Sequence, residues 1–175
     1  LKMCTMENYY RGTAQSVKGE FTVDYYMVNE TYEYFAVEGM LHGRYFTEDE
    51  VNNAENVAVI DEAGAKAFFG STDVVGQSFY VDLYGDLLEY RIVGVRKAKE
   101  SQLMNLVNNL NGDYNLVKLE TPYTHYEKAT NDTWIMDNNS DVLISSDSPD
   151  VNDTLKRIVN ILESRHDVRG EEQFY

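Results

Sequence analysis

Three residues with oxygen-bearing side chains alternate late in the chain: Asp137, Asn139 and Asp141. Their D-x-N-x-D spacing is that of a calcium-binding loop, in which such oxygens ligate the ion. The remaining positions do not fit, because Val142 stands where the loop needs glycine and Ser148 where it needs a bidentate glutamate. We therefore favour an Asx-rich turn leading into a strand, and we predict neither a metal nor a cofactor.

The other candidate metal-ligating and catalytic residues do not have the spacing of a known site. The three histidines, His42, His125 and His166, are far apart and have no metal-ligand spacing. The neighbouring carboxylates Glu48, Asp49 and Glu50 are expected by chance in so acidic a chain. The G-x-S-x-G, P-loop and G-x-G-x-x-G patterns are all absent. We predict that the chain is not an enzyme, and an acid–base hydrolase stays only as a third alternative.

Charge restricts the partners. The chain has 30 acidic and 15 basic residues and a net charge of −15, which argues against nucleic acid because phosphates must be met by Lys and Arg. The single cysteine, Cys4, excludes an internal disulfide. No stretch approaches the roughly 18 apolar residues needed to span a bilayer. We interpret the acidity first as a source of solubility and second as a means of attracting cationic peptides.

The 14 tyrosines are a more open signal. Tyrosine suits both strands and interfaces. We predict that most tyrosines in the N-terminal quarter lie in strands and core. Tyr123, Tyr126 and Trp134 flank a polar segment that reads as a loop, so we predict these three as candidate partner contacts.

The stretch from residue 37 to 95 carries clear local signals. Thr47 and Glu50 have capping-box spacing, which predicts a short helix. Residues 57–60 form a β-branched apolar run, typical of a strand buried on both faces. Asp61 can cap the helix that follows, and Gly70 can end it in the left-handed conformation. Alternation then predicts a strand over residues 79–83, and Gly94 in the next strand predicts a bulge or a close backbone approach.

The flanks predict further elements. We expect strands over residues 20–28, 115–119 and 142–145, and an amphipathic helix over 103–110. The last helix should begin with Ser148 as N-cap and Pro149 at its first position. Its predicted buried stripe is Val151, Leu155, Ile158 and Leu162.

In order and spacing, the stretch resembles the MacB-like periplasmic core domain of ABC transporter permeases of the MacB/FtsX-like family. A "GR-x-F" element, a "vAVI" strand, an "lFG" helix end, a "vGq" turn and a "vVGV" strand follow one another. The residues that carry the resemblance are Gly43, Arg44, Phe46, Val57, Ile60, Phe69, Gly70, Gly76 and Gly94.

The resemblance implies an α+β fold, with mixed sheet and packed helices in two small lobes. It implies that residues 1–175 are a single extracytoplasmic domain of a larger membrane protein, with transmembrane helices on both sides. Such a domain transmits conformational change from a cytoplasmic ABC ATPase subunit to work outside the membrane, and the full-length permease is dimeric. That work is peptide export, lipoprotein release or control of a cell-wall hydrolase. The alternative is a secreted carbohydrate- or peptide-binding module that uses tyrosines and acidic residues.

Overall fold

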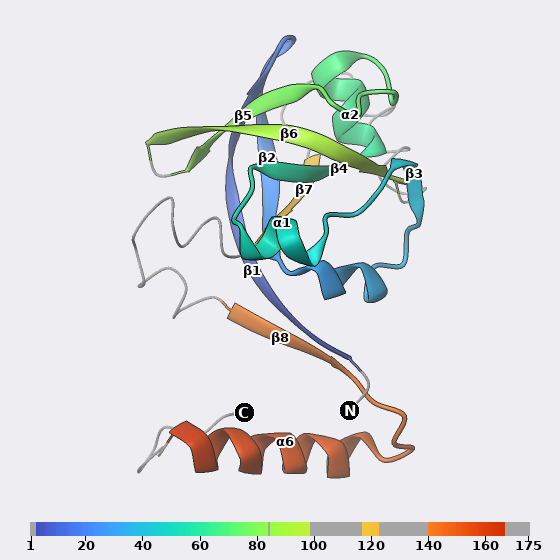
Figure 1. Ribbon diagram of the computed structural model, residues 1–175, viewed down its shortest axis with the longest axis vertical. Helices are drawn as coiled ribbons and strands as arrows, with labels where there is room; N and C mark the ends of the chain where they lie inside the picture. Colours follow the sequence, from blue (N-terminus) through green and yellow to red (C-terminus); the bar gives the residue numbers. More distant parts are fainter. Residues whose placement is uncertain (1–2, 84, 99–116, 123–139, 167–175) are drawn as a thin grey trace. The chain divides into compact units, whose positions relative to one another are not determined.

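The computed structural model describes residues 3–83, 85–98, 117–122 and 140–166 (Figure 1). Two compact units form, one from residues 5–143 and the other from residues 1–4 and 144–175. Among the described residues no helix is long and apolar enough to cross a membrane. The elements are β1 (Met3–Ser16), β2 (Gly19–Val28), η1 (Glu30–Tyr34), β3 (Met40–Gly43), α1 (Glu48–Asn52), β4 (Val57–Asp61), α2 (Glu62–Phe69), β5 (Ser78–Leu83), β6 (Asp86–Arg96), β7 (Val117–Pro122), β8 (Ser140–Ser145) and α6 (Val151–His166).

Strand pairing in the larger unit closes into a ring. β1 pairs antiparallel with β2, and β2 pairs parallel with β7. β7 then pairs antiparallel with β4, and β4 pairs parallel with β6. β6 pairs antiparallel with β5, which returns to β1 through Thr13–Gln15. The strands therefore enclose a barrel-like interior, while β3 pairs with β6 outside the ring.

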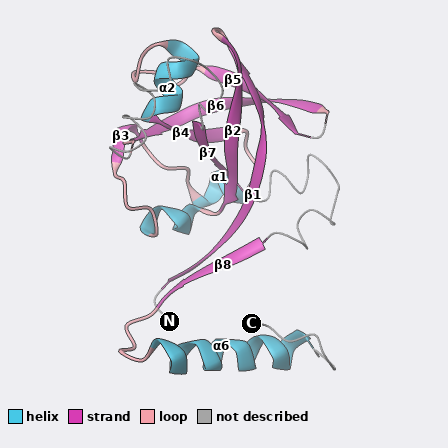
Figure 2. Cartoon of the chain, turned by 180° about the vertical axis from the view of Figure 1, so that it is seen from behind, coloured by secondary structure: helices cyan, strands magenta, loops and turns pink. Residues whose placement is uncertain are grey.

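Two apolar clusters lie on the two faces of this sheet. The interior cluster is rich in aromatic side chains, which include Tyr25, Phe68, Phe79 and Tyr90. The second cluster joins the outward side chains of β2, β4 and β6 to η1 and α1. Both views show α2 on one side of β4 and β6, and η1 and α1 on the other (Figures 1 and 2). The prediction of an α+β fold with a mixed sheet is confirmed.

The helix ends follow the sequence signals. Thr47 and Glu50 form both bonds of the capping box at the start of α1. Asp61 caps α2 by accepting a hydrogen bond from the backbone N–H of Gly64. Gly70 ends α2 in the left-handed conformation, with φ of 78°. These three predictions are confirmed, because each depends only on residues a few positions apart.

The strand predictions are mostly confirmed, with shifted ends. Every residue of β4 is buried, as its apolar run predicted, and β5 alternates between exposed and buried positions. The strand predicted over residues 115–119 is β7, which runs two to three residues later along the chain. The helix predicted over 103–110 lies outside the described residues. The long strand β1 was not predicted.

The smaller unit corrects two predictions. Helix α6 begins at Val151, so Ser148 is not its N-cap and Pro149 is not its first residue. The Ser148 hydroxyl accepts the N–H of Asp150 instead, and the Asp150 carboxylate accepts the N–H of Asp153, in the position of a cap. The predicted burial of the apolar stripe is wrong: Val151 is 76% and Leu155 is 54% exposed. Helical periodicity identifies the apolar side of a helix, but it does not say whether anything covers it.

Gly94 marks a close approach between backbones. The residue lies in β6 opposite Gly43, beside a register shift in the pairing of β6 with β4. A Cβ at Gly94 would stand 2.2 Å from the carbonyl oxygen of Arg44 and 2.3 Å from the Met40 methyl group. Gly43 itself has φ of 68°, a conformation that a side chain makes costly. The bulge and close approach predicted from the sequence are both present.

We expect Gly94→Ala to destabilise the protein by about 1–3 kcal/mol or more, because the Arg44 backbone has to move to admit a methyl group. Urea unfolding measures the change. Gly39→Ala is the matched control, since a Cβ there meets nothing within 4 Å and the backbone is not left-handed. Equal free energies of unfolding for the two variants would show that the backbone at Arg44 can move to admit a methyl group without cost, and would contradict the prediction.

Candidate functional site

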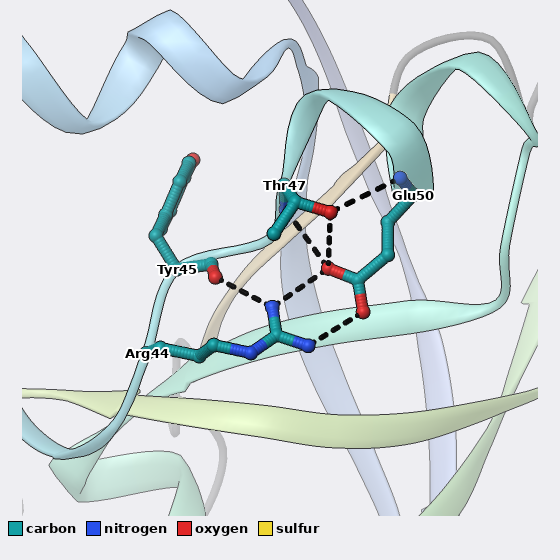
Figure 3. A network of polar contacts seen from close by, with 4 residues as sticks. All are labelled: Arg44, Tyr45, Thr47 and Glu50. Carbon is teal, nitrogen blue, oxygen red and sulfur yellow. Dashed lines mark hydrogen bonds and ion pairs between the residues drawn. The ribbon is translucent and has the colours of Figure 1, made fainter.

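Arg44 and Glu50 form a two-pronged ion pair that closes the turn before α1 (Figure 3). Arg44 Nη1 lies 2.7 Å from Glu50 Oε2, and Nη2 lies 2.8 Å from Oε1. The same guanidinium donates to the carbonyl oxygen of Tyr45 at 2.9 Å. Glu50 Oε2 also accepts the N–H of Thr47 at 2.8 Å. The pair therefore fixes residues 44–50 as one rigid turn.

The Arg44–Glu50 pair is asymmetric in its exposure. The Arg44 side chain is 53% exposed, whereas that of Glu50 is 9% exposed. Hydrogen bonds from Arg44 lower the pKa of Glu50 to about 2. Because the pKa is lowered, ionised Glu50 stabilises the fold above pH 4.5, and this contribution is lost as the pH falls toward 2.

A second charged cluster is buried on the outer face of β6 and β7. Arg96 donates to both oxygens of Glu120, at 3.1 Å through Nε and 2.8 Å through Nη2. The Arg96 and Glu120 side chains are 5% and 2% exposed. Lys118 Nζ lies 3.4 Å from Oε1 of the same carboxylate. One carboxylate therefore balances two cations, and we call Arg96, Lys118 and Glu120 the Glu120 cluster.

Each cation of the Glu120 cluster also binds the segment formed by residues 29–53, which we call the cover segment. Arg96 Nη1 donates to the carbonyl oxygen of Glu38 at 2.7 Å, and its guanidinium lies 5.3 Å from the ring centre of Tyr45. Lys118 donates to the Tyr32 hydroxyl at 3.2 Å and lies over the Tyr26 and Tyr32 rings. The cluster thus ties the cover segment to the barrel at separate points.

The pKa values of three tyrosines around the Glu120 cluster are raised, chiefly by burial. Burial and the Glu120 carboxylate raise the pKa of Tyr45 well above its usual value. Burial raises the pKa of Tyr26 to about 12, and burial raises that of Tyr32 further. These hydroxyls therefore stay protonated at any physiological pH, so they add no charge to the cluster.

Asp61 is a buried carboxyl at the junction of β4 and α2. Its Oδ1 accepts the N–H of Gly64 at 2.6 Å, and its Oδ2 accepts the N–H of Lys118 at 3.4 Å. Burial raises the pKa of Asp61 to about 6, against the lowering effect of these two hydrogen bonds. Asp61 therefore links α2 to β7, and it holds a proton more tightly than an ordinary aspartate.

The predicted family-signature residues lie in the apolar clusters and at turns of the backbone. Phe46, Val57 and Ile60 are buried in the two apolar clusters, and Phe69 packs against the interior cluster. Gly76 is left-handed, with φ of 89°. Tyr123, Tyr126 and Trp134 lie outside the described residues, so their role as partner contacts stays a prediction.

Among the residues considered as metal ligands, Asp137, Asn139 and His125 lie outside the described residues. Within the described ranges no three His, Cys, Asp or Glu side chains are placed to hold a metal ion. His42 lies 3.3 Å from the Thr72 hydroxyl. Of the three neighbouring carboxylates, Glu48 and Asp49 are exposed, whereas Glu50 is buried and paired with Arg44.

The sequence reasoning missed the Glu120 cluster. Arg96 and Glu120 are 24 residues apart, and nothing local connects them. One signal was available: Lys118 and Glu120 alternate with Val117 and Leu119, so a strand there places both charges on one face. Their burial depends on the cover segment, which periodicity does not reveal.

Comparison with known proteins defines the family. The profile of the MacB-like periplasmic core domain matches residues 5–160, so the chain belongs to that family. It is 30% identical over 148 residues to the macrolide export ATP-binding/permease protein MacB of Aggregatibacter actinomycetemcomitans, a match that covers 82% of this chain and 20% of the relative. The chain thus spans about a fifth of that relative's length.

Solved structures share the fold. The periplasmic region of MacB from Actinobacillus actinomycetemcomitans matches with a TM-score of 0.71 at 20% identity, covering 95% of this chain and 68% of the other. The extracellular domain of the ABC-type transporter YknZ from Gram-positive bacteria matches with a TM-score of 0.69 at 16% identity, covering 97% and 78%. The expected MacB-like fold is therefore confirmed.

We expect Glu120→Gln to lower the free energy of unfolding by about 3–5 kcal/mol, because it leaves two cations without their buried counter-charge. Denaturant unfolding measures the loss. Glu62→Gln is the control: Glu62 pairs with the exposed Lys66, and its loss should cost below about 1 kcal/mol. The double variant Arg96→Met/Glu120→Leu should lose less than Glu120→Gln. If Glu120→Gln matched the control, the cluster would not hold the cover segment.

We expect Asp61→Asn to remove a pH dependence of stability. Because the folded pKa of about 6 lies above the unfolded value of 3.8, the contribution of Asp61 is fully present below pH 3.8 and is lost as the pH rises through 6. Asparagine keeps the Oδ1 that caps α2. Relative to the wild type, the variant should gain up to roughly 3 kcal/mol between pH 4 and 7. Parallel wild-type and variant curves would contradict the raised pKa.

Proposed function

We propose that residues 1–175 form a single extracytoplasmic domain of an ABC transporter permease in the cell membrane. In this role the domain transmits conformational change, driven by a cytoplasmic ABC ATPase subunit, to events outside the membrane. The family match across residues 5–160 carries this proposal. The name of the 30%-identical relative, an export ATP-binding/permease protein, supports it.

The geometry suits a domain that passes on a displacement. In a closed ring of paired strands, no strand can slide without breaking hydrogen bonds on both sides. The cover segment is attached to this ring by the Glu120 cluster and by an apolar cluster. The larger unit should therefore move as one rigid body, which is what a mechanical relay requires.

The partners follow from the same proposal. The permease acts as a dimer, so two copies of the domain lie outside the membrane and change their separation when ATP is bound and hydrolysed. Beyond the membrane, the domain acts on a peptide, a lipoprotein or a cell-wall protein. The net charge of −15 favours cationic segments among these.

A distance measurement on the full-length permease with its ATPase in lipid vesicles tests the proposal. Spin labels at Val17→Cys, in a Cys4→Ser background, mark the exposed turn between β1 and β2. The distance between the two copies should change on ATP addition, and it should not change with an inactive ATPase. A failure of ATP to alter this distance would reject the relay.

A second label pair tests rigidity separately. Val17 and Val37 are both exposed, at 81% and 89%, and they lie on the barrel and the cover segment. The distance between labels at these two positions within one copy should stay constant through the ATP cycle. A change within one copy, with a constant distance between copies, would place the motion inside the domain and contradict the rigid relay.

A further inference from the structure

The outer surface of β1, β2 and β5 carries a polar strip that the proposed relay does not use. Residues at alternate positions of these strands point away from the interior, since their neighbours Ala14, Phe79 and Val81 are buried in it. We call this strip the tyrosine-flanked face, formed by Tyr9, Arg11, Thr13, Thr22, Tyr80 and Asp82.

A hollow of about 370 Å³ lies within the tyrosine-flanked face, which is in the size range of small-molecule sites. Its lining consists of Tyr10, Arg11, Gly12, Thr13, Thr22 and Asp82. Gly12 admits the Tyr10 ring, because a Cβ there would stand 2.6 Å from the Tyr10 Cε1 atom. The outward-pointing side chains of the lining are thus those of Arg11, Thr13, Thr22 and Asp82, which offer hydroxyl, carboxylate and guanidinium groups, whereas the Tyr10 ring packs against the interior cluster.

The charged groups of the hollow are held in place before any ligand arrives. Asp24 Oδ1 accepts from Arg11 Nε at 3.0 Å and from the Tyr9 hydroxyl at 2.7 Å. The Arg11 side chain is 57% exposed, and its hydrogen bond to Asp24 uses Nε rather than the terminal NH₂ groups. Asp82 Oδ1 accepts the N–H of Gly85 at 2.8 Å, which orients the carboxylate. Such preorganisation lowers the entropic cost of binding.

Exposed tyrosine rings flank the hollow along the strand. Tyr9 is 40% and Tyr80 is 42% exposed. Tyr80 pairs with Gln15, six positions after Tyr9 on β1, so the two rings are roughly 20 Å apart along the strand direction. A ligand that uses both rings must therefore be an extended chain.

We propose that the tyrosine-flanked face binds an uncharged polysaccharide chain. Sugar rings stack their apolar faces on tyrosine and present vicinal hydroxyls, for which carboxylates, guanidinium NH₂ groups and threonine hydroxyls are matched partners. Charge argues against anionic chains, because Asp24 and Asp82 outnumber Arg11 here and the net charge is −15. This inference goes beyond the proposed relay and does not depend on it.

A peptide fits the same face less well. The hollow has no apolar recess for the buried anchor side chain that dominates peptide affinity. Addition of a peptide strand needs a free edge, and over Thr13–Gln15 β1 has none, because it is paired there with β2 on one side and with β5 on the other. Side-chain recognition of a polar chain is therefore the better match.

Calorimetric titration of the 175-residue chain with cellotetraose, maltotetraose and tetra-N-acetylchitotetraose tests the proposal. At least one of these neutral tetrasaccharides should bind with a Kd of about 1 mM or below. Tetragalacturonate, which is anionic, should not bind. Absence of binding by all three neutral probes, or binding of tetralysine in their place, would overturn the proposal.

Variants locate the binding. Tyr80→Ala and Tyr9→Ala should each weaken binding of the neutral probe about tenfold or more. Asp82→Asn should weaken it similarly while keeping an oxygen for the N–H of Gly85. Tyr34→Ala is the control, because Tyr34 is 73% exposed on η1, outside the strip. Thermal unfolding of each variant confirms folding, and sugar binding that is indifferent to Tyr80→Ala and Asp82→Asn would also overturn the proposal.

Discussion

One buried carboxylate, Glu120, is shared between Arg96 and Lys118, and these two cations also bind the cover segment. A buried ion pair is a poor source of stability compared with apolar side chains of the same volume, because both charges lose their water. What it supplies is a strong penalty for any arrangement that separates the partners. Each cation here also binds a cover residue, so displacement of the cover segment loses the hydrogen bonds to the Glu38 carbonyl oxygen and the Tyr32 hydroxyl and uncovers the buried charges. The cluster therefore positions the segment together with the β3–β6 pairing and the second apolar cluster.

The barrel makes such a cluster possible. β7 is short, and its inward residues Val117 and Leu119 are fully covered by the interior. Strand alternation then directs Lys118 and Glu120 outward together. The interior is filled by aromatic rings in contact, from Phe21 through Phe68 and Phe79 to Tyr90 and Tyr25. The Tyr25 and Tyr90 hydroxyls bond to each other, which satisfies both in an apolar surrounding. The packed aromatic interior thus fixes β6 and β7, and with them the outward side chains of the Glu120 cluster.

Local signals in the sequence predicted local structure well. The Thr47 capping box, the Asp61 cap and the Gly70 helix end each involve residues within a few positions, and each is present. The Glu120 cluster could not be predicted from the sequence, because it joins residues of β6, β7, η1 and the turn before β3, which are far apart along the chain. In a chain with 30 acidic residues, moreover, no local pattern distinguishes Glu120 from the other glutamates. The prediction that the apolar stripe of α6 is buried was wrong, because amphipathic periodicity is a local property of the helix, whereas burial requires another element to cover it.

Gly94 connects the two charged sites physically. Without a side chain there, the backbone of residues 43–45 can lie against β6, and the Arg44 N–H donates to the carbonyl oxygen of Val93 at 3.1 Å. From that position Arg44 reaches Glu50, and the Tyr45 ring lies against Arg96 of the Glu120 cluster. A side chain at position 94 would therefore disturb both ion pairs through one displaced turn. Gly94 and Arg44 of the family signature are thus parts of one contact.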